Sequence, residues 1–222
     1  LRTPLMTFQT SSTLLRRRLA AGKDVEPTLA SIERQINRFS KMVTSLSEVS
    51  RLESGGALTL LPAPTDIWQL LRDTVETHEE ALRVCSDQPH TLTVDAPATA
   101  LEVLADGDRL RQVLLNLIEN AIKYSPQGGN VAVRGEVIDG GVALSVSDSG
   151  IGIPEADQPL VIRRYFRAGN APPENFAGVG LGLSIAKEII EAHGGKLSLQ
   201  SKLGNGTTVT MTLPVGGQGA QL

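Results

Sequence analysis

The chain has 222 residues, of which 41% are hydrophobic and 3% aromatic, so one or two domains with a largely aliphatic core are expected. A net charge of -3 and a pI near 5.7 give no electrostatic footprint for nucleic acid, so no nucleic-acid partner is expected. The single cysteine, Cys85, excludes a disulfide framework, and no apolar run reaches the ~18 residues of a membrane span.

The first 55 residues carry two runs of heptad-spaced apolar residues, from Leu1 to about Gly22 and from Pro27 to about Leu52. The turn at 22–24 between them predicts an antiparallel helical hairpin with a narrow apolar seam. Such a hairpin cannot bury its seam alone, so we expect a homodimer whose two hairpins form a four-helix bundle. The alternative is that both helices pack on the chain's own globular domain.

The region 56–215 alternates helix and strand patterns, and the glycine-rich tail 216–222 is expected to be flexible. Strands are predicted at 58–61, 90–95, 131–137, 142–146, 196–201 and 207–213, and helices at 65–82, from Asp106 or Asp108 to before Pro126, and at 184–193. The stretch 148–177 lacks periodicity, which is typical of a functional loop such as a lid. With a boundary near Gly55, the fold class is α+β: the hairpin, then an α/β sandwich whose mixed sheet carries helices on one face.

One predicted helix places Asn116, Asn120 and Lys123 on the same face, because offsets of three and four residues are helical neighbours. Its apolar residues spread around the opposite side, as a helix packed on a core requires. Amide oxygens suit a hard cation such as Mg²⁺, and an ammonium group suits phosphate. The helix is therefore predicted to hold a metal-bound nucleotide.

Two glycine-rich segments follow this helix. Asp148 ends a predicted strand before Gly150 and Gly152, so its carboxylate could accept a hydrogen bond from the exocyclic amine of a base, although a strand cap with turn glycines is the simpler interpretation. Gly178-Val-Gly-Leu-Gly182 leads into a helix whose N-terminal N–H groups could bind phosphate. Each segment alone is a weak signal. The specific signal is their order along the chain: a helix with two asparagines, then a glycine-rich segment after a strand, then a second glycine-rich segment before a helix.

The remaining candidate residues are assigned no catalytic or metal-binding role, and His193 is interpreted as structural. His193 lies at an expected helix C-terminus before two glycines, where a cation and a glycine cap are both favourable. His78 and His90 have no ligand partners at metal-binding spacing, and Cys85 is isolated.

This series resembles the catalytic domain of sensor histidine kinases, within the ATP-binding fold shared with gyrase, the Hsp90 chaperones and mismatch-repair ATPases. Asn116–Pro126 is similar to the N box of the family, Asp148–Gly152 to its first glycine box and Gly178–Gly182 to its second. Residues 162–167 occupy the place of the F box. The hairpin resembles the dimerisation and phosphotransfer domain, because Leu1-Arg-Thr-Pro-Leu5 is similar to the end of the phosphoacceptor motif.

The resemblance implies ATP and Mg²⁺ as ligands, with Asn120 and Asn116 at the metal. ATP contacts would come from Asn116, Asn120, Lys123, Tyr124, Asp148, Gly150, Gly152, Gly178, Gly180, Leu181, Gly182 and Thr207. Catalytic roles would fall to Asn116, Lys123 and Arg167. Thr3 matches the threonine that positions water when such kinases dephosphorylate their regulator.

The implied activity is that of a histidine autokinase, which passes phosphoryl from ATP to a bundle histidine and then to an aspartate in the receiver domain of a response regulator. That histidine and its following acid would lie just before Leu1, so the chain is expected to be N-terminally truncated. A cytoplasmic location is expected, with any membrane attachment through upstream segments. Ile162 and Arg163 replace the usual Phe and Glu of the F box, which affects how the lid would dock on the bundle.

Two other functions fit the same motifs. A clamp ATPase of this fold would need a carboxylate one turn before the metal asparagine to activate water. That position is Asn116, and Glu119 points ~60° away on the helix. A dimeric scaffold with a degenerate nucleotide pocket is the third interpretation.

Overall fold

The computed structural model of the chain describes residues 2–53, 58–85, 90–171 and 180–215. It contains two compact units, Leu1–Gly56 and Ala57–Leu222. The first unit is helical and the second contains a mixed sheet with helices, so the predicted α+β class is confirmed. None of the described helices is long and apolar enough to cross a membrane.

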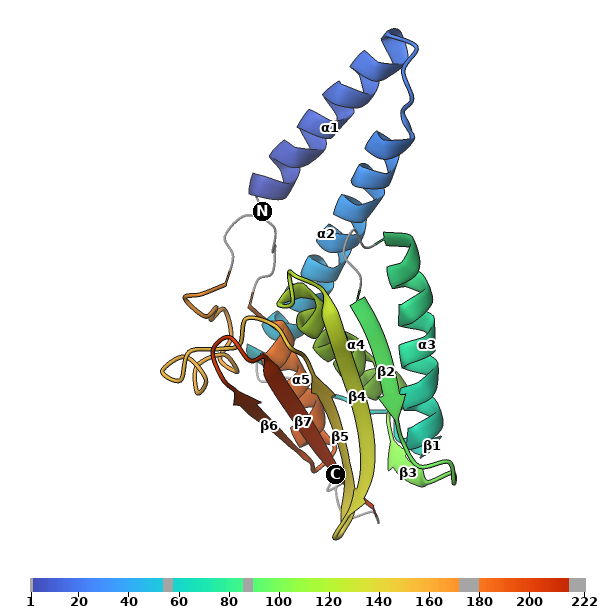
Figure 1. Ribbon diagram of the computed structural model, residues 1–222, viewed down its shortest axis with the longest axis vertical. Helices are drawn as coiled ribbons and strands as arrows, with labels where there is room; N and C mark the ends of the chain where they lie inside the picture. The colour runs from blue at the N-terminus through green and yellow to red at the C-terminus, as the bar shows by residue number, and fades with distance from the viewer. Residues whose placement is uncertain (1, 54–57, 86–89, 172–179, 216–222) are drawn as a thin grey trace. The chain divides into compact units, whose positions relative to one another are not determined.

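The first unit is a hairpin of α1 (Arg2–Ala20) and α2 (Glu26–Glu53), as predicted (Figure 1). The Asp24 carboxylate accepts the N–H of Glu26 at 3.0 Å and so caps the start of α2. Several large apolar side chains remain exposed on the hairpin, among them Leu19 (61%), Ile36 (50%) and Val43 (46%). The hairpin thus presents apolar surface that it does not bury itself, which is the basis of the dimer prediction.

The second unit is built on a five-stranded sheet with the strand order β2-β4-β5-β7-β6. Its strands are β2 (His90–Asp95), β4 (Gly129–Ile138), β5 (Gly141–Ser147), β6 (Lys196–Ser201) and β7 (Thr207–Pro214). The β2–β4 pair is parallel and the other three pairs are antiparallel. This is the mixed sheet that the sequence predicted.

A separate two-stranded ribbon joins β1 (Ala63–Asp66) to β3 (Glu102–Ala105) in antiparallel register. The strand predicted at 58–61 is therefore wrong, and the strand at 102–105 was not predicted. Pro64 is tolerated because this ribbon is all edge, where a strand need not donate every N–H. Asp66 Oδ1 accepts the N–H groups of Trp68 (3.0 Å) and Gln69 (3.2 Å), so the next helix begins at Ile67 rather than at 65.

The helices α3 (Ile67–Cys85), α4 (Gly107–Lys123) and α5 (Gly182–Ala192) cover one face of the five-stranded sheet (Figure 1). The core between them and the sheet is aliphatic, as the composition predicted. Its fully buried side chains include Leu71, Leu110, Leu114, Ile118, Leu144, Ile189, Ile190 and Met211. Trp68 is also buried, over Gly135, where any Cβ would overlap the indole ring.

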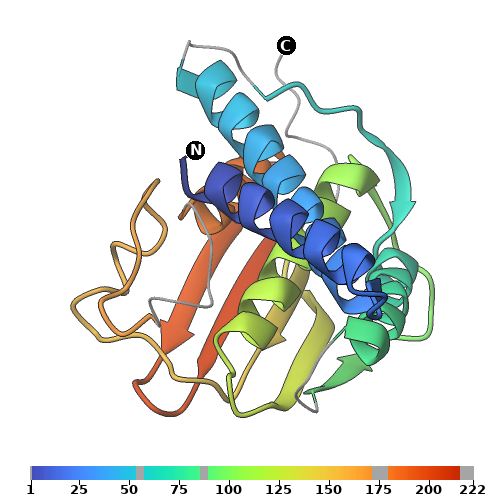
Figure 2. The ribbon, with the colours of Figure 1, turned by 90° about the horizontal axis from the view of Figure 1, so that it is seen from above.

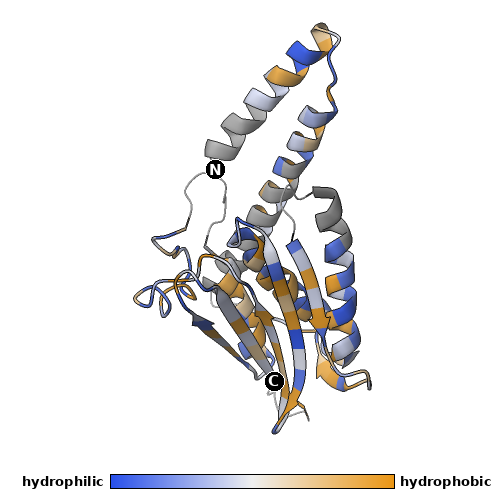
Figure 3. Cartoon of the chain, in the orientation of Figure 1, coloured by the Kyte–Doolittle hydropathy of each residue, from blue (hydrophilic) through white to orange (hydrophobic). Residues whose placement is uncertain are grey.

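The strands alternate in polarity, which Figure 3 shows as alternating colours along the sheet. In β5, Val142, Leu144 and Val146 are buried, whereas Ser145 and Ser147 are only partly so. In β7 the buried residues Val209, Met211 and Leu213 alternate with threonines. The helices therefore cover the apolar face, and the opposite face is lined with serine and threonine.

Candidate functional site

The predicted site residues on α4, β5, α5 and β7 are brought to one end of the sheet. The last turn of α4, the end of β5, the start of α5 and the start of β7 all lie there (Figure 1). The loop that follows β5 leaves from the same end without helix or strand over 148–171 (Figures 1 and 2). Chain segments far apart in the sequence therefore form a single region, as the order of motifs predicted.

The polar face of α4 meets the beginning of α5. A Cβ on Gly182 would overlap the side-chain oxygen of Asn116, so the two helices approach this closely only because residue 182 is glycine. Asn116 Nδ2 is buried, and it has no hydrogen-bond partner among the described residues. A buried amide donor without a partner is costly, which is consistent with a group that a ligand completes.

The end of α4 carries Lys123 and Tyr124 side by side. The Lys123 ammonium lies 5.0 Å from the centroid of the Tyr124 ring, a distance at which the cation and the ring attract each other. Burial raises the pKa of the Tyr124 phenol, and the positive charge of Arg167 on the loop opposes that shift. Arg167 therefore acts electrostatically on the end of α4, although its side chain is exposed.

The loop after β5 is fixed to the end of α4 by backbone contacts. The Ile151 N–H donates to the Tyr124 carbonyl at 3.0 Å, and a Cβ on Gly150 would overlap that carbonyl. Ser125 is 3% exposed, and its hydroxyl has no partner among the described residues. Gly150 thus allows the close approach between the two segments. The buried Ser125 hydroxyl was not predicted, because nothing in its local pattern distinguishes it from a turn residue.

The carboxylate of Asp148 is oriented by backbone donors. Its Oδ1 accepts the N–H of Gly150 at 2.8 Å and the N–H of Thr207 at 3.2 Å, while the Asp148 N–H donates to the Thr207 carbonyl at 2.9 Å. Burial raises the pKa of Asp148, and the two backbone hydrogen bonds lower it by less. Oδ1 is thus occupied, and Oδ2 has no partner in the described part of the chain, which leaves it available to a donor from a ligand.

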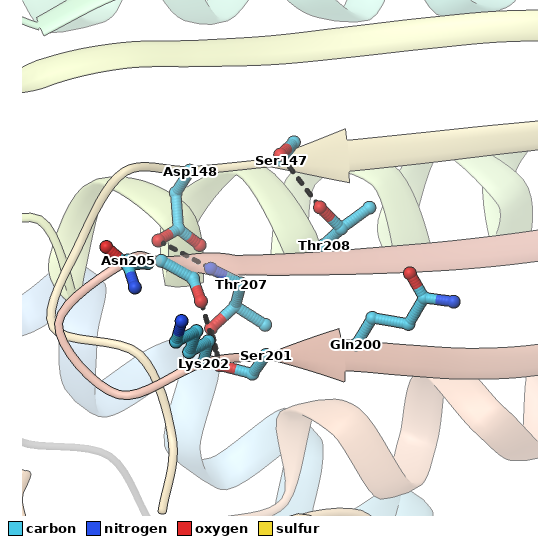
Figure 4. Close-up of a pocket in the computed structure, with 9 residues that line it drawn as sticks. Ser147, Asp148, Gln200, Ser201, Lys202, Asn205, Thr207 and Thr208 are labelled. Atoms are coloured by element: carbon cyan, nitrogen blue, oxygen red, sulfur yellow. Dashed lines mark hydrogen bonds between the residues drawn. The ribbon is translucent and has the colours of Figure 1, made fainter.

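Figure 4 shows a shallow polar depression of about 300 Å³ between the ends of three strands. It shares Asp148 and Thr207 with the predicted site but includes no residue of α4 or α5. Its other lining residues are Ser147, Gln200, Ser201, Lys202, Asn205, Gly206 and Thr208. The depression therefore adjoins the predicted site at Asp148 and Thr207 but does not outline a nucleotide pocket.

The start of α5 presents backbone N–H groups that no side chain caps. Leu181 is the N-cap residue, and its side chain makes no capping hydrogen bond. Gly180 has a φ of +74°, and any Cβ there would lie 2.7 Å from the Phe166 carbonyl oxygen. An uncapped helix N-terminus lined by glycine is favourable for an anion such as phosphate.

Two predicted site residues are not among the described residues of the second unit. Gly178 lies outside the described residues. Thr3 belongs to α1, in the other compact unit. The remaining predicted residues, from Asn116 to Thr207, lie at the same end of the sheet.

Magnesium would be held here mainly by amide oxygen and by the phosphates of a nucleotide. The described residues contain no cluster of three His, Cys, Asp or Glu side chains that could hold a metal ion. Mg²⁺ commonly takes one or two protein ligands, with phosphate and water completing its shell. The partly exposed Asn120, one helical turn after Asn116, fits that role.

At the opposite end of the sheet, His193 joins α5 to α4. Its Nε2 accepts the N–H of Asp106 at 3.0 Å, and its Nδ1 bonds the carbonyl of Ile189 at 2.7 Å. These bonds require the neutral ring with the proton on Nδ1, rather than the imidazolium that a helix C-terminus favours. The structural role inferred for His193 stands, but its physical basis is a cross-link between helices and not a charge.

Two family models match the chain. The model of the histidine kinase-, DNA gyrase B- and HSP90-like ATPases matches residues 105–217, and that of the His Kinase A (phospho-acceptor) domain matches residues 1–55. The chain belongs to the sensor histidine kinase family. Both halves of the resemblance proposed from the motifs are thereby confirmed.

Relatives of this histidine kinase chain extend over nearly all of its length. The sensor histidine kinase WalK of Bacillus subtilis is 34% identical across 96% of the chain, which spans 35% of WalK. The structure of ShkA in complex with AMPPNP matches 99% of the chain and 47% of ShkA, with a TM-score of 0.68 and 26% identity. Histidine kinase ThkA in complex with the response regulator TrrA matches 97% of the chain and 58% of that chain, with a TM-score of 0.68 and 26% identity.

Proposed function

We propose that this chain binds Mg·ATP and is the kinase portion of a sensor protein that phosphorylates a histidine on its own helical hairpin. The observation that carries the proposal is the contact between Asn116 and Gly182, which brings the polar face of α4 to the uncapped start of α5. A metal-binding asparagine face and an anion-binding helix N-terminus are thus adjacent, as a metal-bound triphosphate requires.

Each end of the nucleotide has a proposed partner. Asp148 Oδ2 accepts the adenine amino group, with Gly152 and Thr207 beside it. Asn120 and Asn116 hold Mg²⁺, and Lys123, Arg167 and the backbone at Gly180 and Gly182 neutralise the phosphates. Mg²⁺ supplies charge neutralisation when it is bound, and the chain supplies orientation.

The residue at position 116 favours transfer of the γ-phosphoryl group to another domain over hydrolysis of ATP. The residue one turn before Asn120 is an amide, which cannot act as a general base toward water. Phosphoryl transfer to a positioned nucleophile needs mainly alignment and charge neutralisation, which this site offers.

The partners follow from the exposed hairpin and from the relatives. We propose that two hairpins pair through their apolar side chains, and that the phosphoryl group passes on to a response-regulator aspartate, as the ThkA–TrrA complex suggests. Thr3, near the start of α1, is proposed to position water in dephosphorylation of the regulator. The location proposed for this portion is cytoplasmic.

The test uses the full-length protein and ATP labelled at the γ-phosphate. We expect an acid-labile, base-stable label on a histidine, and its loss in Asn120→Ala together with at least about tenfold weaker Mg·ATP binding by calorimetry. Asn130→Ala, at an exposed position on β4, is the control and should match the wild-type protein. Release of phosphate without a labelled histidine would favour the clamp ATPase, and failure to bind ATP would favour the scaffold.

A further inference from the structure

An ion pair ties the loop after β5 to the middle of α5. Arg164 donates from Nη2 to Glu188 Oε1 at 2.5 Å and from Nε to the same oxygen at 3.2 Å. The two side chains are only 29% and 26% exposed. Glu188 Oε2 is buried, and it has no partner in the part of the chain that the structure describes. The Glu188 carboxylate is thus largely removed from water and depends on Arg164 for compensation of its charge.

The residue next to Arg164 is held in a strained conformation. Tyr165 has a φ of +65° and is the only non-glycine residue with a positive φ in the described ranges. This region costs an L-residue with a Cβ roughly 1 kcal/mol or more, so surrounding contacts must hold it there. The Tyr165 N–H donates to the Gly180 carbonyl at 2.8 Å, and the backbone of Tyr165 lies against Gly180.

The segment 163–167 therefore has two attachments close together, one to α5 through Glu188 and one to Gly180, just before α5 begins. A turn closes within the segment, because the Phe166 N–H donates to the Arg163 carbonyl at 3.3 Å. Arg167 follows this turn and acts electrostatically on Tyr124 at the end of α4. Only two residues, Tyr165 and Phe166, separate the ion-paired Arg164 from Arg167.

We propose that Arg164 is a positioning residue for phosphoryl transfer, whose ion pair with Glu188 fixes the segment 163–167 on α5 and so holds Arg167 toward the phosphates. This inference rests on the proposed function. Arg164 does not itself contact the nucleotide in this role. It stabilises the strained turn at Tyr165 and removes the freedom that Arg167 would otherwise have to turn into solvent.

The first test is limited proteolysis of Glu188→Gln with trypsin. The variant keeps the volume of the side chain and one acceptor oxygen but removes the charge, and it leaves the cleavage sites after Arg163, Arg164 and Arg167 intact. We expect cleavage in this segment to be about tenfold faster, because cleavage follows the population of the detached segment. Saturating Mg·ATP should slow it in both proteins.

The matched control is Glu191→Gln on the same helix. Glu191 pairs with Lys187 at 3.3 Å, but both side chains are about half exposed, and neither forms a hydrogen bond or ion pair with the described residues of the loop after β5. The chemical change is identical, so any general effect of neutralising a glutamate on α5 appears in both variants. We expect the control to be cleaved at the wild-type rate.

The second test separates positioning from general stability. In the full-length protein, Glu188→Gln should lower the autophosphorylation kcat at least about fivefold, with KM for ATP changed less than about twofold. The exchange Arg164→Glu with Glu188→Arg should restore slow amide hydrogen exchange in residues 163–167, whereas Arg164→Gln alone should not. The Arg164→Gln variant lies on the loop, so it remains informative if changes on α5 disturb folding.

The possible results separate the inference from the proposed function. Wild-type rates of cleavage and exchange in Glu188→Gln and Arg164→Gln, with Mg·ATP still bound, would overturn the inference alone. If the wild-type protein binds no Mg·ATP but Glu188→Gln still releases the segment 163–167, the proposed function would be overturned. The attachment of the segment to α5 through Glu188 would still be supported.

Discussion

The side chain of Asn116 occupies the space that Gly182 leaves by having no Cβ. Gly182 is the first residue of α5, so one missing methyl group sets the distance between the face of α4 proposed to bind metal and the start of α5 proposed to bind phosphate. Adding that methyl group is the most direct way to test the site without removing any polar group.

Gly182→Ala should weaken Mg·ATP binding by about tenfold or more, because overpacking of this kind costs about 1–3 kcal/mol. Calorimetric titration of the chain measures the affinity. Gly107→Ala is a matched control, since Gly107 is the first residue of α4 and a Cβ there would make ordinary contacts of 3.4 Å or more. Equal affinities of the two variants would contradict the role assigned to the Asn116–Gly182 contact.

Asp148→Asn should weaken adenine-nucleotide binding at pH 7 without destabilising the ligand-free protein. Because burial raises the pKa of Asp148, the stability associated with this group is full below the ordinary value of 3.8 and declines as pH rises through the raised pKa. Asparagine carries no charge, so the variant should be at least as stable as the wild type at pH 7, and that advantage should disappear below about pH 3.8. Thermal unfolding across this range measures it.

Asp106→Asn should show the opposite pH dependence. Burial raises the pKa of Asp106, but hydrogen bonds from the N–H groups of Leu61 and Arg109 and the charge of Arg109 together lower it overall. The carboxylate therefore stabilises the protein above pH 3.8, and this stability is lost as pH falls through the lowered pKa. The variant should be less stable than the wild type at pH 7 and should approach it in acid. A constant difference at every pH would argue against this assignment.

His193→Ala should lower stability but leave the affinity of the folded protein for Mg·ATP unchanged. The substitution leaves the N–H of Asp106, a residue 8% exposed, without its acceptor, at a cost of about 1–3 kcal/mol. We expect a fall in Tm of about 2–12 °C, measured by the fluorescence of Trp68, which is the only tryptophan. An unchanged Tm with altered affinity would instead place His193 in the binding machinery.

Ile36→Glu combined with Val43→Glu should convert the dimer to a monomer in sedimentation experiments. Both side chains are about half exposed within the hairpin, so their replacement affects association more than the fold of the hairpin itself. Leu15 and Phe39 are partly buried within the hairpin and are less suitable positions. Ala20→Glu, exposed at the end of α1, is the control. A persistent dimer in the double variant would exclude this seam as the interface.

The sequence predicted those parts of the fold that depend on local periodicity. The heptads of the hairpin, the amphipathic α4 capped by Asp106 and the hairpin of β4 and β5 all follow from residue spacing. The ribbon of β1 and β3 did not, because each strand has only four residues and its pairing joins segments nearly 40 residues apart. Pairing at that distance leaves no pattern within either strand.

The site was predictable as a set of residues but not as a set of contacts. Asp148 and Thr207 were both predicted, and their mutual backbone and side-chain hydrogen bonds emerge only from the pairing of β5 with β7. The Arg164–Glu188 pair and the Asp106–His193 bond join residues 24 and 87 positions apart. Nothing in the spacing of these residues indicates that they meet.

The uncovered face of the five-stranded sheet has a consequence for how this chain tolerates change. Along β7, residues 208, 210 and 212 are partly buried threonines on the face away from α3, α4 and α5, whereas Val209, Met211 and Leu213 are buried on the face that these helices cover. Saturation mutagenesis of residues 209–213 should tolerate changes at Thr210 and Thr212 and should not tolerate polar residues at Val209, Met211 and Leu213. Thr210 and Thr212 are therefore the positions of β7 where substitution is expected to change stability least.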